Sequence, residues 1–139
     1  MSNNFFNEIV FDFELLEDWE ERYRYIIELG KKLPPMQSIS KTPENKVEGC
    51  ASQVWLEQQI ITTGDQKLIQ LSGDSDAMIV KGLIAILVSL LNGEELEKAK
   101  KINPLEEFNK LGLNEHLSSQ RANGLRSMVN SIQRFISES

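Results

Sequence analysis

The residue best suited to chemistry in this 139-residue chain is its single cysteine, Cys50. It follows Gly49 and precedes two small residues, Ala51 and Ser52, and an apolar, β-favouring run begins at Val54. Glycine adopts backbone angles that other residues resist, and small neighbours leave a sulfur within reach of a bulky partner. The pattern predicts a thiol displayed on a short turn that leads into a strand. The alternative is an inert buried cysteine, which is a common fate of unpaired cysteines.

Two kinds of thiol chemistry are open to Cys50. A nucleophilic hydrolase would need the imidazole of His116, the only histidine, within hydrogen-bond reach of the sulfur. Thiol exchange would instead need a thiolate, which a nearby arginine or a helix N-terminus favours. Because the chain has no second cysteine, any sulfur gained by Cys50 must pass to another protein or to a reductant.

Several other classes of function are excluded. Zinc or an iron–sulfur cluster needs three or four Cys and His ligands, and this chain has one of each, so we expect no metal site. The net charge is −6 and the basic residues are scattered, which argues against a nucleic-acid partner. The longest apolar run, residues 82–91, is about half of the roughly 20 residues that a membrane span needs. With no basic leader and a lone cysteine, we expect a cytoplasmic protein.

The elements that must position Cys50 begin with two helices. The whole chain, 1–139, is expected to form one domain, with residues 1–6 flexible. A short helix is predicted over residues 7–15, and a second begins at Asp18, which caps it with Glu21 three residues later. Pro34 and Pro35 end the second helix.

A strand region follows over residues 46–72. Residues 54–62 and 68–71 are predicted to pair through a turn at Gly64-Asp65, and Val47 is expected to begin a further strand. Cys50 would then lie at the connection between the first two strands of a small antiparallel sheet.

Residues 73–76 are expected to open a helix that runs from about Ala77 to Leu91 and is apolar all round, which places it at the centre of the fold. Asn103 and Glu106 are predicted to cap a later helix. The last helix should begin at Ser118 or Ser119, with an apolar stripe made by Leu125, Met128, Val129, Ile132 and Ile136. The predicted fold class is α+β, with several helices packed on a three-stranded antiparallel sheet.

Four segments of the chain resemble the SufE family of sulfur acceptors. The segment GCASQVW at 49–55 matches the family's cysteine motif. The other matches are WEERY with IIELG at 19–30, GDSDA with IVKGL at 73–83, and HLS, Arg121 and Gly124-Leu125 at 116–125. The likeness runs in order from about Trp19 to Phe135.

The resemblance implies a SufE/IscU-like fold and a specific role. In the family, the cysteine matched by Cys50 takes persulfide sulfur from the cysteine desulfurase SufS, stimulates that enzyme, and passes sulfur to the SufBCD scaffold, through SufB, for iron–sulfur cluster assembly. The chain would then be a carrier and an activator, not an enzyme. It would need no cofactor of its own, because the pyridoxal phosphate belongs to the desulfurase. The family likeness also suggests a weak homodimer.

The resemblance extends to two further positions. Asp76 and Arg121 match family residues implicated in placing the cysteine loop or in docking the desulfurase. The alternatives are a carboxylate in a first helical turn for Asp76 and an exposed charge near the last helix for Arg121. Gly49, Ala51 and Ser52 would make the loop mobile, although Ala51 departs from the glutamine common in the family. We expect Cys50 to rest against apolar surface and to swing outward on docking.

Three other functions are weighed against the SufS-linked acceptor. One is a CsdE-type acceptor that serves a different desulfurase with the same chemistry. A second, from another class, is a thiol hydrolase that uses Cys50 and His116. The third is a structural activator that binds the desulfurase without accepting sulfur.

Overall fold

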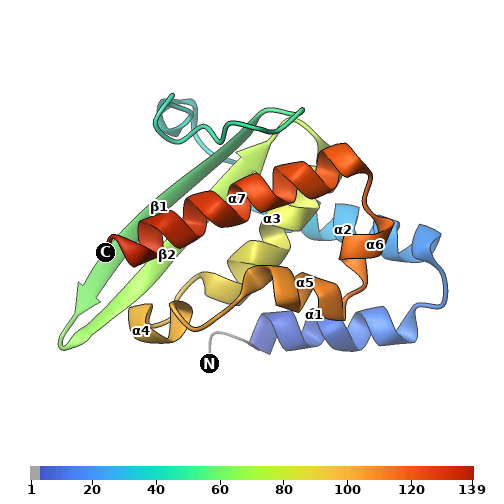
Figure 1. The fold of residues 1–139 in the computed structure, drawn as a ribbon, viewed down its shortest axis with the longest axis horizontal. Coiled ribbons are helices and arrows are strands. Elements are labelled where there is room, and N and C mark those ends of the chain that lie inside the picture. The colour runs from blue at the N-terminus through green and yellow to red at the C-terminus, as the bar shows by residue number, and fades with distance from the viewer. Residues whose placement is uncertain (1–3) are drawn as a thin grey trace.

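The computed structural model describes residues 4–139 and shows helices packed on one β-hairpin (Figure 1). The hairpin, β1 and β2, follows the first two helices and a 3-10 turn, and five helices follow it. In chain order the elements are α1 (Asn4–Leu15), α2 (Trp19–Lys32), η1 (Ser38–Ser40), β1 (Val54–Thr63), β2 (Gln66–Ser75), α3 (Met78–Leu91), α4 (Leu96–Ala99), α5 (Pro104–Lys110), α6 (Leu113–His116) and α7 (Ser119–Ser137).

The sheet has two strands, so the predicted three-stranded sheet is wrong, although the α+β class is confirmed. β1 and β2 pair in antiparallel register from Val54↔Ser75 to Thr63↔Gln66. The segment expected to form the third strand makes only one bridge, Lys46↔Trp55. Gly49 follows shortly after with a φ of 88°, which turns the chain out of the extended conformation before a ladder can grow.

β2 is longer than predicted and runs almost to the start of α3. The helix predicted from about Ala77 to Leu91 is confirmed, with Ala77 at its N-cap, but Gly73 to Ser75, expected to lead into it, continue the strand. A Cβ on Gly73 would lie 2.8 Å from side-chain atoms of both Leu56 and Ile84. The missing side chain therefore lets this part of β2 pass closely between its partner strand and α3.

The predicted helix caps are confirmed. The Asp18 carboxylate accepts the Glu21 N–H at 2.8 Å, and the Asn103 side chain accepts the N–H of Glu106. α1 begins at Asn4, earlier than predicted. The expected flexibility of residues 1–6 falls partly on residues 1–3, which lie outside the described part of the chain.

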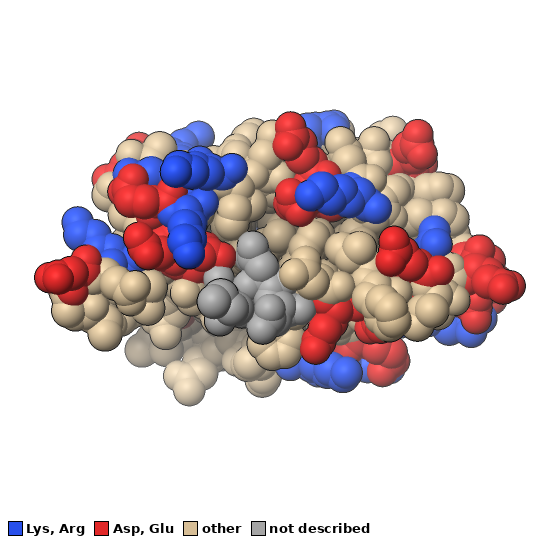
Figure 2. All heavy atoms as spheres, turned by 90° about the horizontal axis from the view of Figure 1, so that it is seen from below, with Lys and Arg blue, Asp and Glu red and all other residues tan. Residues whose placement is uncertain are grey.

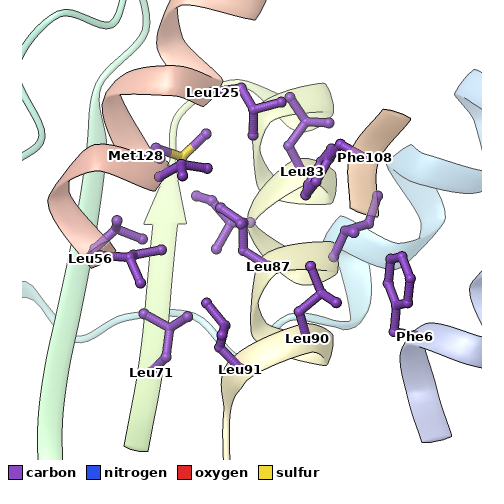
Figure 3. Packing of buried hydrophobic residues seen from close by; sticks show 14 of the residues in the cluster. Phe6, Leu56, Leu71, Leu83, Leu87, Leu90, Leu91, Phe108, Leu125 and Met128 are labelled. Atoms are coloured by element: carbon purple, nitrogen blue, oxygen red, sulfur yellow. The ribbon is translucent and has the colours of Figure 1, made fainter. Parts of the chain in front are cut away.

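The core is centred on α3, as predicted for a helix that is apolar on all sides. Its residues contact β2 on one side and α1 and α2 on another. Leu83, Leu87, Leu90 and Leu91 of this helix point into the packed cluster shown in Figure 3, where Leu125 and Met128 of α7 meet them from the side of the hairpin. The predicted apolar stripe of α7 is buried along its whole length.

The surface carries charges of both signs. On the face shown in Figure 2, acidic and basic side chains alternate and form no extended basic stripe. Within residues 4–139, no helix combines the length and the apolar character that crossing a membrane would require.

Candidate thiol site

Cys50 lies on the loop between the Lys46 bridge and β1, and this loop packs against the start of α7. The thiol is half-buried and donates a weak hydrogen bond to the carbonyl oxygen of Gly124, with an Sγ···O distance of 3.7 Å. A Cβ on Gly124 would lie 3.5 Å from the sulfur. The backbone of α7 therefore approaches the thiol closely and covers one side of it.

A surface cavity of about 360 Å³ opens beside the sulfur. Its walls are mainly apolar side chains of β1, α3 and α7, namely Val54, Val80, Leu83, Leu125 and Met128. Ala51 and Ser52 of the loop and Ser118, Gln120 and Arg121 at the start of α7 add small and polar groups. The predicted apolar resting place for the thiol is thus present in the structure.

Two contacts hold the ends of the cysteine loop. On one side, Gly49 packs so closely on α7 that a Cβ would lie 2.6 Å from Oγ of Ser127. On the other side, the Asp76 carboxylate accepts the N–H of Gln53 at 3.1 Å, and the Asp76 N–H donates to the Gln53 carbonyl at 3.3 Å. Asp76 lies before α3, not in its first turn, so it acts on the loop by hydrogen bonding and not through the helix dipole.

The environment of Cys50 favours the neutral thiol. Burial raises the pKa of the Cys50 thiol, and the nearby negative charge of Glu48 raises it further. Both effects disfavour the thiolate. In this conformation the sulfur is therefore a protonated, weakly nucleophilic group.

Arg121 lies on the wall of the cavity, but it does not bind the sulfur. Its side chain is exposed, and its backbone N–H donates to the Ser118 hydroxyl at 3.2 Å, which closes the N-cap of α7. Arg121 therefore contributes to the lining of the cavity and to the N-cap of α7.

His116 is engaged elsewhere. Its ring stacks on Trp19 with centroids 3.9 Å apart, and its carbonyl oxygen accepts the hydroxyl of Tyr23. It does not line the cavity beside Cys50, and no hydrogen bond joins it to the thiol within residues 4–139. This geometry gives no support to a Cys50–His116 hydrolase.

The structure also places residues around the loop that sequence reasoning missed. Ser127 and Gly124 contact the loop from α7, and Asp74 holds the preceding segment through Met36 and Lys41. Gly124 and Asp74 lie in the segments that resemble the SufE family, so the resemblance could have pointed to both residues. Ser127 had none. The described residues contain no group of three or more His, Cys, Asp or Glu side chains that could hold a metal ion.

These features define a class: an α+β protein that carries one half-buried thiol on a loop beside an apolar cavity. Comparison with known proteins specifies it further. The family model described as "SufE: Fe-S metabolism associated domain" matches residues 7–136, so the chain belongs to the SufE family.

Two relatives agree with this assignment, and a solved structure shares the fold. The chain is 51% identical over 127 residues to an uncharacterized SufE-like protein of Rhizobium meliloti, covering 91% of both chains. It is 50% identical over 127 residues to another from Rhizobium etli, covering 91% of this chain and 86% of the relative. The solution structure of a hypothetical protein from Thermus thermophilus has the same fold, with a TM-score of 0.74 at 20% identity over 96% of this chain and 93% of the other.

Proposed function

We propose that this protein accepts persulfide sulfur on Cys50 from the cysteine desulfurase SufS, stimulates that enzyme, and passes the sulfur to the SufBCD scaffold. The single observation that carries the proposal is the half-buried thiol beside an apolar cavity, on a loop where Gly49 has a positive φ just before Cys50. Membership of a family associated with iron–sulfur metabolism supports it.

The transfer is a thiol exchange without net redox change. The Cys50 thiolate attacks the terminal sulfur of the donor persulfide, so a new S–S bond forms at Cys50. The bond between that sulfur and the donor cysteine breaks, and the donor leaves as a thiolate. The Cys50 proton goes to solvent or to a base of the partner.

The half-buried, protonated state of Cys50 is consistent with a thiol that reacts little between transfers. A protonated sulfur held against Gly124 reacts slowly with oxidants and stray electrophiles, because the thiolate is the reactive form. Attack then requires the loop to leave the cavity, which removes the burial that raises the pKa. Docking on the desulfurase moves the loop out of the cavity.

Alanine release by purified SufS tests the proposal. SufS with cysteine and a reductant is assayed alone, with this protein, and with its Cys50→Ser variant. We expect stimulation by the native protein only. Full stimulation by Cys50→Ser would overturn the carrier role and favour the structural activator. A parallel assay with a Csd-type desulfurase separates the CsdE-type alternative, since the cognate enzyme should be stimulated more strongly.

A further inference from the structure

Asp74 is a buried carboxylate that lies two residues before Asp76 and is only 5% exposed. Its Oδ1 accepts the N–H of Ser75 at 2.8 Å and lies 3.5 Å from Nζ of Lys81. Its Oδ2 accepts the N–H of Met36 at 3.2 Å and lies 3.4 Å from Nζ of Lys41. One carboxylate thus joins β2, α3 and the chain that leads from α2 towards Cys50.

Asp74 carries its charge at neutral pH. Burial alone would raise its pKa, but the N–H groups of Met36 and Ser75 and the charges of Lys81 and Lys41 outweigh burial and hold the pKa of this carboxyl below its ordinary value. Its contribution to stability is therefore complete above the ordinary carboxyl pKa, and it is lost as the pH falls through the lowered one.

The chain held by Asp74 is residues 36–47, here called the 36–47 segment. Past Lys41 it is attached to the hairpin by two backbone hydrogen bonds, Leu56 N–H to Asn45 carbonyl at 2.8 Å and Val47 N–H to Val54 carbonyl at 2.9 Å. Its η1 turn projects from the body of the fold in Figure 1. So short an attachment is weak by itself, because pairing of two isolated strands is marginal in water.

Lys41 connects Asp74 to the same attachment. Its ammonium lies 3.4 Å from the Asp74 carboxylate and 4.9 Å from the centre of the Trp55 ring. Trp55 in turn forms the bridge with Lys46. The contact between Asp74 and Lys41 therefore lies beside the bridge between Lys46 and Trp55. That bridge holds the part of the 36–47 segment closest to Cys50.

We propose that Asp74 is a positioning residue for the Cys50 thiol. It fixes the chain on the N-terminal side of the cysteine loop through Met36 and Lys41, while Asp76 fixes the C-terminal side through Gln53. Both carboxylates come from the Gly73-Asp74-Ser75-Asp76 segment of β2 and its extension. The inference deepens the proposed function, because it names what holds the thiol in its resting place until a partner docks.

Alkylation of the free protein by iodoacetamide, followed across pH, tests this without any desulfurase. In Asp74→Asn we expect Cys50 to react about tenfold faster at neutral pH, because weakening of charge-assisted hydrogen bonds shifts a closed–open equilibrium by that order. In Lys41→Met, which removes the ion pair with Asp74 but not these hydrogen bonds, we expect a smaller increase in the same direction. We also expect the pH profile to move towards that of an ordinary thiol as burial is lost. Asp74→Asn keeps the size of the side chain. Lys41→Met leaves Asp74 and its contact with Lys81 in place, so we expect this variant to fold even if Asp74→Asn does not.

Ile136→Ala is the matched control. Ile136 is buried at the C-terminal end of α7, away from the loop that packs on its start, so its truncation lowers stability without touching the thiol. A faster reaction in both loop variants but not in Ile136→Ala supports positioning. Wild-type rates and pH profiles in folded Asp74→Asn and Lys41→Met would overturn it. Failure of the SufS assay alone would leave this result standing and would count only against the proposed function.

Discussion

Two cavities of similar size lie at opposite ends of α7, and only one of them adjoins a thiol. The cavity beside Cys50 measures about 360 Å³, and the one at the C-terminal end measures about 390 Å³. Both have mainly aliphatic walls; the second is lined by Leu91, Ile102, Pro104, Ile132 and Ile136 among others. An apolar hollow of this size is therefore not by itself a sign of function in this fold. The reactive group on its wall makes the difference.

The two ends also differ in how their walls are held. At the C-terminal end of α7 the wall residues come mainly from α3, α7 and the chain around α4 and α5. At the thiol end a loop forms one wall, and it is held by Asp76, by the close fit of Gly49 and by a weak bond to Gly124. Segments held by few contacts open at lower free-energy cost than packed helices. The comparison predicts that the thiol end can move while the other end stays closed.

The largest expected effect is a loss of unfolding free energy at the C-terminal end of α7, away from the thiol. Ile136→Ala removes a side chain that is 4% exposed, and such truncations cost about 2–5 kcal/mol of unfolding free energy. Urea unfolding should show this loss, while the alkylation rate of Cys50 stays at the wild-type value under native conditions. Faster alkylation in this variant would mean that the two ends are mechanically coupled, against the comparison.

A smaller effect is expected at the hinge of the loop. Gly49→Ala places a Cβ at positive φ and against Ser127 Oγ, so it should cost about 1–3 kcal/mol of stability and expose the thiol to faster alkylation.

Gly64→Ala is the control for Gly49→Ala, because Gly64 also has a positive φ, 61°, but a Cβ there would meet nothing within 4 Å. It should show strain without any change at Cys50. Adding Ser127→Ala to Gly49→Ala removes the 2.6 Å conflict and should recover part of the loss. Equal alkylation rates in the Gly49 and Gly64 variants would argue against the close fit on α7.

The smallest effect concerns charge. Glu48→Gln removes the negative charge that adds to burial in raising the pKa of Cys50, so the alkylation profile should shift to lower pH. The shift should be smaller than that produced by opening the loop, because burial is the larger cause. Thermal unfolding should be nearly unchanged, since Glu48 is exposed. A profile that moves to higher pH would contradict the assigned cause.

Much of this organisation could be predicted from local sequence. The apolar circumference of α3, the stripe of α7 and the caps at Asp18 and Asn103 depend on short-range patterns, and all were confirmed. The third strand was not foreseen correctly, because a single bridge at Lys46 and a run of paired residues look alike in sequence. The strand that continues through Gly73 to Ser75 depends on a close approach of Ile84, which lies in a different element.

The site was predictable only where it depends on residues close together in the sequence. Cys50 stands out because it is the only thiol, and the small residues beside it indicate a turn. Its contact with Gly124 lies 74 positions away in the chain, and the hydrogen bond from Gln53 to Asp76 spans 23, so neither follows from spacing. The role of Asp74 depends on four partners from three parts of the fold. Only the three-dimensional structure brings those partners together.

Intact-protein mass after incubation with SufS and cysteine tests the central claim most directly. The native protein should gain the mass of one sulfur atom, the gain should be reversed by a reductant, and Cys50→Ser should show none. That result would establish Cys50 as a persulfide carrier. Absence of the gain in the native protein, under conditions where binding to SufS is demonstrated, would contradict the account.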